Sequence, residues 1–77
     1  MNVEIITPDK KLYSGEASVV TVPGAAGSFQ VMKDHAPIIS TLLSGQVRVK
    51  DAKGEQSFTI NGGVVEVQQN KVIVLAD

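Results

Sequence analysis

Apolar residues recur with a period close to two along most of the chain, and Gly, Pro, Asn or Asp interrupts the pattern at short intervals. This alternation, with its many β-branched residues, is typical of β-strands, and no stretch fits a helix of ordinary length. The pattern therefore predicts an all-β domain. The expected strands are Val3–Thr7, Lys11–Ser14, Ala17–Val22, Ser28–Met32, Ile38–Leu42, Gln46–Lys50, Gln56–Ile60, Gly63–Gln68 and Lys71–Leu75.

The connections between these strands contain turn-forming residues. Pro23-Gly24 predicts a type II turn, because proline fixes the first central torsion and glycine accepts a positive φ at the second. Asp51–Gly54 and Gln69-Asn70 predict hairpin tips, and Asn61-Gly62-Gly63 tolerates left-handed backbone. Short strands joined by such turns favour a two-layer, flattened β-sandwich or barrel, which we expect to occupy residues 1–77 as one domain.

Several strands place large apolar side chains on both sides of the pleat, although a two-layer sandwich buries only one face of each strand. One set is expected to point away from the core, and no remaining segment is long enough to form a covering helix. A β-bulge would let two adjacent apolar residues both point inward. Because the feature recurs six times, we favour a face that another protein covers. The positions are Ile5-Ile6, Val19-Val20, Ile38-Ile39, Leu42-Leu43, Val64-Val65 and the run Val72–Leu75.

Composition narrows the classes of partner and of stabilising group. The chain has 77 residues, no cysteine, 43% apolar and 19% charged residues, and a formal net charge of -1. A disulfide framework, a structural zinc site and a disordered chain are therefore not expected, nor is a basic surface for nucleic acid. The longest apolar run, Val72–Ala76, is far too short for a membrane span, so we expect no direct insertion into a bilayer.

The chain offers little material for catalysis. His35 is the only imidazole, no cysteine is present, and no serine lies in a Gly-x-Ser-x-Gly pattern. Chain order would allow a triad of His35, Asp34 and a serine, but a domain of this size leaves little room for a substrate cavity. The loop Gly24–Gly27 lacks the following helix and Lys-Ser/Thr pair of a phosphate-binding loop. We therefore expect no enzyme activity, no cofactor and no metal.

Val31-Met32-Lys33 is similar to the site of biotin- and lipoate-carrying domains, which are short all-β chains with a modified lysine in a hairpin turn. In this sequence Asp34 occupies the position of the second methionine of the biotin-type motif, and His35–Pro37 has no counterpart there. A carrier domain modified on Lys33 is the alternative function, and a general protein-binding sandwich is a third.

Eight segments spread along the chain share one resemblance: Thr7-Pro8-Asp9, Leu12–Gly15, Val20–Gly24, Gly27–Met32, His35–Ile38, Ser44–Val49, Asn61–Val67 and Asn70–Asp77. Through these segments the chain as a whole resembles the epsilon subunit of F-type ATP synthases. The resemblance implies a β-sandwich of about ten short strands in the central stalk, between the gamma subunit and the polar loops of the membrane c-ring. Its implied role is non-catalytic: it helps to fix gamma to the ring, so that proton transport is coupled to ATP synthesis.

The resemblance also implies site residues. His35-Ala36-Pro37 matches a loop that faces gamma, Thr7 stands at another gamma-facing position, and Gly27-Ser28 corresponds to the tip that meets the c-ring. Relatives often carry a carboxylate at the position of Ser28. For His35 two roles stay open, a direct contact with gamma or a hydrogen bond that locks the loop. Asp34 is expected to cap a short turn.

Most members of that family continue into a C-terminal pair of helices that binds ATP. Because the sequence stops at Asp77, we expect no inhibitory switch and no nucleotide site. The absence of a transit peptide favours the cytoplasmic face of a bacterial inner membrane, or the stromal face of a thylakoid.

Overall fold

The computed structural model describes residues 1–77 and consists of strands and turns. This confirms the all-β class. None of its elements is an apolar helix of membrane-spanning length. The strands are β1 (Asn2–Ile6), β2 (Lys11–Glu16), β3 (Val19–Val22), β4 (Phe29–Met32), β5 (Ile38–Asp51), β6 (Gly54–Gln68) and β7 (Lys71–Ala76).

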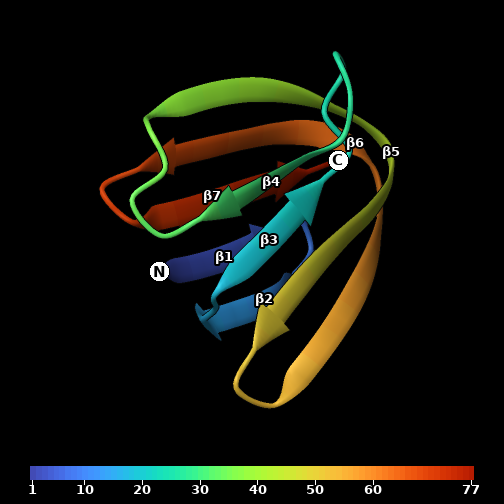
Figure 1. Cartoon of the computed structure of the whole chain (residues 1–77). Coiled ribbons are helices and arrows are strands. Elements are labelled where there is room, and N and C mark those ends of the chain that lie inside the picture. Colours follow the sequence, from blue (N-terminus) through green and yellow to red (C-terminus); the bar gives the residue numbers. More distant parts are fainter.

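The strands form a single seven-stranded sheet in the order β2-β1-β7-β6-β5-β3-β4. All pairs are antiparallel except β1 and β7, which run parallel. The long strands β5 and β6 bend together, so the sheet folds over on itself into two layers (Figure 1). We call the first layer β2, β1, β7 and the adjoining halves of β6 and β5, and the second layer β4, β3 and the other halves of β5 and β6. The predicted two-layer sandwich is thus confirmed.

The structure has seven strands, whereas the sequence pattern predicted nine and the resemblance implied about ten, so both counts are wrong. Ile38–Leu42 and Gln46–Lys50 were expected to be separate strands, but both lie in β5, and the two segments Gln56–Ile60 and Gly63–Gln68 both lie in β6. The pairing of β5 with β6 continues through the interruption, where Ser44 lies opposite Asn61 and Gly45 opposite Ile60. Small and polar residues interrupt the apolar pattern at this point because the ladder bends there. The remaining strands agree with the prediction within two residues at each end.

Glycines allow the bend in β6. Gly62 has a φ of 115° and Gly63 a φ of 142°, values that side-chain-bearing residues rarely adopt. A Cβ on Gly63 would also overlap the carbonyl oxygen of Leu75 on the neighbouring strand β7. The bend therefore requires glycine at this position for both conformational and steric reasons.

Both predicted hairpin tips are present. Asp51 pairs with Gly54 at the tip that joins β5 to β6. Gln69 and Asn70 have φ values of 51° and 59° in the tip that joins β6 to β7. Two consecutive positive φ values suit a two-residue hairpin turn whose twist matches that of the flanking strands.

The predicted type II turn at Pro23-Gly24 is wrong. Gly24 extends the ladder beyond β3 by forming an isolated bridge with Leu42, so its φ is not positive. The reversal occurs later, where the Gly27 N–H donates to the Gly24 carbonyl at 3.0 Å and Gly27 has a φ of 132°. Pairing with β5 has displaced the left-handed position along the chain.

The core between the layers is apolar throughout. Fifteen apolar side chains are buried and no polar or charged residue is. Since the chain has no cysteine to form a disulfide, this packing is the main source of stability. The buried residues are Val3, Ile5, Ala17, Val20, Val22, Val31, Leu42, Val47, Val49, Ile60, Val65, Val67, Val72, Val74 and Ala76.

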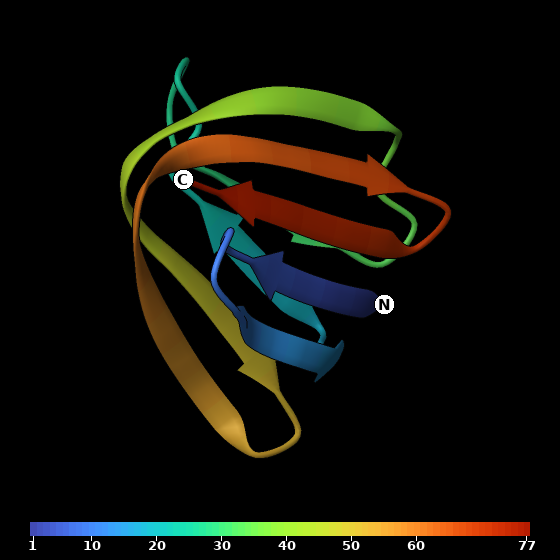
Figure 2. The same cartoon turned by 180° about the vertical axis from the view of Figure 1, so that it is seen from behind.

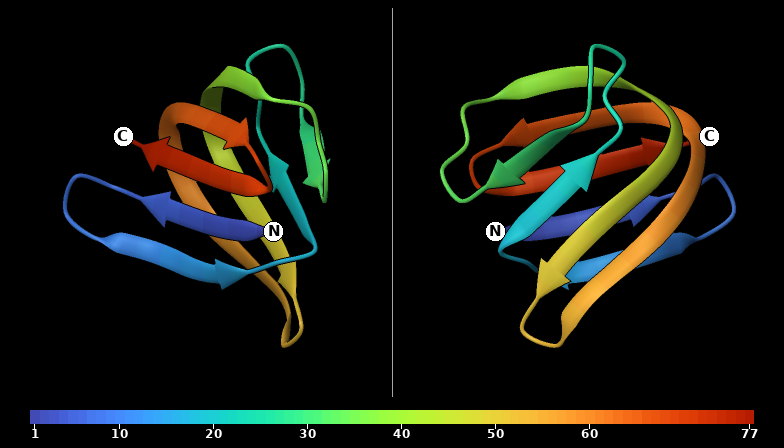
Figure 3. Two further views of the ribbon diagram at one scale, coloured as in Figure 1. Left: turned by 90° about the vertical axis from the view of Figure 1, so that its left-hand side faces the viewer. Right: turned by 45° about the vertical axis from the view of Figure 1, so that its right-hand side comes forward.

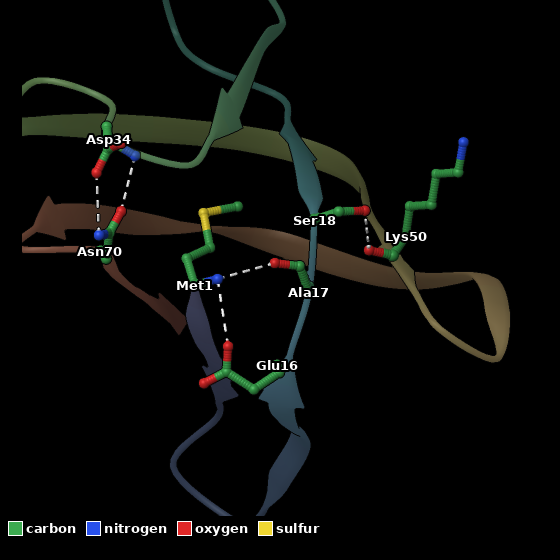
Figure 4. Close-up of polar contacts among 7 residues, drawn as sticks. All are labelled: Met1, Glu16, Ala17, Ser18, Asp34, Lys50 and Asn70. Atoms are coloured by element: carbon green, nitrogen blue, oxygen red, sulfur yellow. Dashed lines mark hydrogen bonds and ion pairs between the residues drawn. The ribbon is translucent and has the colours of Figure 1, made fainter.

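Polar contacts hold the segment that crosses from the first layer to the second (Figure 4). The Met1 ammonium group donates to the Ala17 carbonyl at 3.1 Å and lies 3.3 Å from a carboxylate oxygen of Glu16. The Ser18 hydroxyl donates to the Lys50 carbonyl at 3.1 Å. The crossing segment is thus tied both to the start of β1 and to the end of β5.

Candidate docking surface

The outward side of the first layer carries the apolar residues that the core leaves out. Thr41, Val64, Leu75 and Ile6 form one row across β5, β6, β7 and β1, because each lies opposite the next in the ladder. Paired residues point to the same side of a sheet, as do residues two apart on one strand. We call the side chains of Ile6, Ile39, Val64, Ile73 and Leu75 the outer face.

Exposure values confirm that one set of side chains points away from the core. Ile39 is 71% exposed and Leu75 is 54% exposed, while Leu43, at the bend, is 55% exposed. Figure 2 looks onto the first layer from outside, and no strand or loop crosses it. The register of β1 and β2 does shift between Ile5 and Ile6, as the bulge alternative required. Even so, Ile5 is fully buried and Ile6 only half-buried, so this bulge does not bring both side chains inward.

The outward side of the second layer is different in character. This side has a hollow of about 260 Å³, which is lined mainly by polar side chains, including Arg48, Lys50 and Glu55. Val19 is half-buried there, and its pairing partner Met32 is 53% exposed. The apolar surplus is therefore concentrated on the first layer.

A carboxylate lies within the outer face. In the ladder, Glu66 is opposite Ile39 on one side and Ile73 on the other. The ion pairs of the structure join the Met1 ammonium to Glu16 and Lys11 to Glu4, so no cation of the chain lies within 4.0 Å of Glu66. By contrast, the Lys11 Nζ is 2.8 Å from Glu4, and this hydrogen bond lowers the pKa of Glu4.

The predicted gamma-side loop His35–Pro37 joins β4 to β5 and borders one end of the outer face. The Nδ1–H of His35 donates to the Ala36 carbonyl at 2.7 Å, and the His35 backbone N–H donates to the Met32 carbonyl at 3.1 Å. His35 therefore does lock its own loop. Pro37 lines a hollow of about 310 Å³ together with Ile39 and Glu66.

Asp34 shapes the same loop. Its φ is 63°, it lies in the turn before His35, and its side chain and backbone N–H both bond to Asn70 in the β6–β7 hairpin (Figure 4). The expectation that Asp34 caps its own turn is therefore wrong, because its side chain bonds to Asn70 in another turn.

The structure places Thr7 at the other end of the outer face. Thr7 follows Ile6, which pairs with Leu75, whereas the His35 loop lies beside the hairpin near Lys71, the partner of Asn2. The strand rise puts the two ends roughly 15 Å apart. The Thr7 hydroxyl accepts from the Lys10 N–H at 3.1 Å and donates to the Lys10 carbonyl at 3.0 Å, so it closes its own turn.

Gly27-Ser28, the predicted c-ring tip, lies in the exposed loop between β3 and β4. This loop projects beyond the layers on the side where β5 and β6 bend, away from the β6–β7 hairpin (Figures 1 and 3). The structure therefore keeps the tip and the His35 loop at opposite ends of the molecule.

Lys33 is not in a hairpin turn. It lies in the segment that crosses from β4 in the second layer to β5 in the first, and these two strands are not paired. A carrier lysine is expected at a hairpin tip, so the geometry gives the carrier interpretation no support.

A tyrosine and an aspartate join the first layer to the β5–β6 hairpin. The Tyr13 hydroxyl donates to Asp51 Oδ2 at 2.7 Å, and the Tyr13 ring meets the Phe58 ring edge-on at a centroid distance of 5.8 Å. Burial, followed by the bond to Asp51, raises the pKa of Tyr13 to about 12, and the bond lowers the pKa of Asp51. No nucleophile accompanies the pair, so we regard it as structural.

Sequence reasoning singled out neither Glu66 nor Tyr13, and it placed Asn70 in a hairpin tip without predicting its contact with Asp34. The signal for Glu66 was present, since it is two residues from Val64 and so shares its side of the strand. Tyr13 and Asn70 gave no comparable signal, because their partners Asp51 and Asp34 are distant in sequence.

Comparison with known proteins supports the family suggested by the sequence. The family described as "ATP synthase, Delta/Epsilon chain, beta-sandwich domain" matches residues 1–77. The ATP synthase epsilon chain of Chlorobium limicola is 47% identical over 76 residues, which cover 97% of this chain and 86% of the relative. That of Alkalilimnicola ehrlichii is 40% identical over 78 residues, covering the whole of this chain but 56% of the relative.

Solved structures support the fold. A chain in the mitochondrial ATP synthase of Euglena gracilis, in a structure described as OSCP/F1/c-ring, matches with a TM-score of 0.88 at 18% identity. The match covers 96% of this chain and 48% of that chain. A chain in the central stalk/c-ring structure of the Tetrahymena thermophila enzyme matches with a TM-score of 0.81 at 18% identity, covering 97% of this chain and 61% of that one.

Proposed function

The chain belongs to the β-sandwich family of the ATP synthase delta and epsilon chains, and from this membership we propose that it is a non-catalytic subunit of the rotor stalk. In this role it joins the gamma subunit to the membrane c-ring and helps to couple ion transport to ATP synthesis. The proposed location is the cytoplasmic face of a bacterial inner membrane, with the stromal face of a thylakoid as the corresponding site in a plastid.

The observation that carries the proposal is the apolar outer face. Exposed apolar groups of this kind, gathered on one side of a monomeric domain, mark a surface that a partner covers. A joint in a rotor resists torque better through broad burial of shaped surface than through exposed ion pairs, which contribute little each. We assign the outer face to gamma.

The two predicted gamma-side segments support this assignment. The His35–Pro37 loop borders one end of the outer face and Thr7 borders the other. Because the two ends are roughly 15 Å apart along the strands, a partner that contacts both must lie along the face, as a helix of about ten residues can. Thr7 and the His35–Pro37 loop then contact the two ends of one elongated element of gamma.

We assign the c-ring contact to the loop that carries Gly27 and Ser28. This loop is exposed and projects from the side opposite the His35 loop, so it remains accessible when the outer face is covered (Figure 3). Ser28 offers a hydroxyl rather than a carboxylate, so the expected contact is a neutral hydrogen bond to the polar loops of the ring.

The assignment to gamma is tested by removing apolar side chains from the outer face. In the full chain, Ile39→Ser and Leu75→Ser together should abolish co-purification with gamma, because both side chains are exposed and available to a partner. Met32→Ser is the matched control, since Met32 is 53% exposed but lies on the second layer. Circular dichroism checks that every variant is folded.

The proposal is supported if the double variant loses gamma and the Met32→Ser control retains it. Co-purification that survives in the folded double variant would place gamma elsewhere, and an unaltered chain that binds neither gamma nor the c-ring would overturn the proposed function itself.

A further inference from the structure

Glu66 occupies the middle of the surface that we assign to gamma. It projects between Ile39 of β5 and Ile73 of β7, which lie directly opposite it in the ladder. Val64, two residues earlier, and Leu75, opposite Val64, continue the apolar surface toward Thr7. A partner that covers these side chains therefore also removes Glu66 from water.

Such removal has a large cost for an unpaired carboxylate. An ionised group taken out of water is strongly destabilised unless a cation or several hydrogen-bond donors replace its hydration. An interface that buries Glu66 without such a partner would bind weakly, because the lost hydration offsets the gain from the apolar contacts around it.

Neither ion pair of the structure involves Glu66. Glu4, the other carboxylate on this side at the same level of the ladder, is paired with Lys11 at 2.8 Å. Lys71 shares a shallow hollow with Glu66 but lies beyond 4.0 Å from it. The negative charge of Glu66 is thus the unmatched one among the apolar residues of the outer face.

A hollow beside Glu66 has room for a side chain. It measures about 310 Å³ and is lined by Pro37, Ile38, Ile39, Glu66, Val67 and Gln68. Apolar walls with one carboxylate suit the aliphatic stem and charged head of a long cationic side chain. Gln68 also lines the hollow, and a glutamine amide oxygen is a hydrogen-bond acceptor.

On the basis of the proposed function, we infer that the Glu66 carboxylate forms an ion pair with one lysine or arginine side chain of the gamma subunit. This side chain inserts into the hollow that Pro37 and Ile39 line together with Glu66. The apolar outer face supplies adhesion, and this ion pair fixes the position of gamma along it. A slide of gamma by one strand residue would leave both charges buried and unpaired, so the pair sets the register of the joint.

The test compares three variants of the full chain in binding to purified gamma. Glu66→Gln removes the charge and keeps the shape, Glu66→Leu extends the apolar surface, and Glu55→Gln is the matched control. Glu55 is an exposed glutamate of the same strand β6, but it lies in the second layer opposite Lys50. Dissociation constants are measured at low and at high salt.

We expect Glu66→Gln and Glu66→Leu to bind gamma at least about tenfold more weakly, as loss of one partner of a desolvated ion pair does, and to lose salt dependence. Glu55→Gln should bind like the unaltered chain. If Glu66→Leu binds as tightly as the unaltered chain or more tightly, Glu66 faces no cation and the inference is wrong. The proposed function survives that result, because only an unaltered chain that binds neither gamma nor the c-ring contradicts it.

Discussion

Asp34 and Asn70 are joined by two hydrogen bonds although 36 residues separate them. The Asp34 N–H donates to Asn70 Oδ1 at 2.7 Å, and Asn70 Nδ2 donates to Asp34 Oδ1 at 3.1 Å (Figure 4). Both residues have left-handed backbone, with φ values of 63° and 59°. Each residue therefore shapes its own turn with its backbone and holds the other turn with its side chain.

Two substitutions at Asn70 separate these roles. Asn70→Gly keeps the left-handed backbone without strain and removes the side chain, so the free energy of unfolding should fall by about 1 kcal/mol. Asn70→Ala adds the strain of a left-handed alanine, so it should fall by about 2 kcal/mol. Urea unfolding measures both. An unchanged midpoint in Asn70→Gly would show that the contact contributes nothing to stability.

The bend in β6 should be sensitive to a methyl group at Gly63. Gly63→Ala combines an unfavourable φ with overlap against the Leu75 carbonyl, so we expect a loss of about 3 kcal/mol or more in the free energy of unfolding. Gly27→Ala is the control, because Gly27 has a similar φ of 132° but no atom within 4 Å of the added Cβ. Equal losses in the two variants would mean that overlap at the bend has no effect.

Burial of Tyr13 and its bond to Asp51 should make stability fall at high pH. The pKa of Tyr13 is raised from 10.0 to about 12, so the folded state favours the neutral phenol. This stabilisation is complete below pH 10, the unfolded value, and is lost as the pH rises toward 12. Tyr13→Phe should be less stable at neutral pH and should lack the decline above pH 10 that is due to this group.

Thermal unfolding as a function of pH measures this effect. Asp51 affects stability at low pH instead. Because its pKa is lowered in the folded state, the stabilisation from ionised Asp51 is present above its ordinary pKa of 3.8 and is lost as the pH falls. A Tyr13→Phe variant with the same alkaline decline as the unaltered chain would contradict the assignment.

His35 should matter more for assembly than for stability. Its bond to the Ala36 carbonyl lies at an exposed loop, so His35→Ala should change the melting temperature of the isolated chain by only a few degrees. Without this bond the His35–Pro37 loop is less well defined beside the outer face, and binding to gamma should weaken. A large loss of stability with unchanged binding would show that His35 serves the fold alone.

Local sequence patterns predicted much of the fold and part of the site. Alternation gave the all-β class, and the doublets at Ile38-Ile39 and Val64-Val65 gave an outward apolar set, because strand geometry fixes which neighbours point apart. Gln69-Asn70 and Asp51–Gly54 gave their hairpins for an equally local reason. For these features the residues of one strand or one turn were sufficient, whereas at Pro23-Gly24 pairing with β5 overrode the local signal.

Pairing between strands decided the rest. The sequence by itself determined that one set of apolar side chains would face outward. Only the tertiary structure showed that pairs of predicted strands are continuous in β5 and in β6, and that the positive φ lies at Gly27. It also showed that Thr7 and His35 lie at opposite ends of the outer face. It also placed Glu66 between Ile39 and Ile73. The β5–β6 and β6–β7 hairpins set the place of Glu66. The positions of Gly27 and Thr7 follow from the pairing of β3 with β5 and of β1 with β7, which are distant in the chain, and a single sequence encodes that register in no local signal.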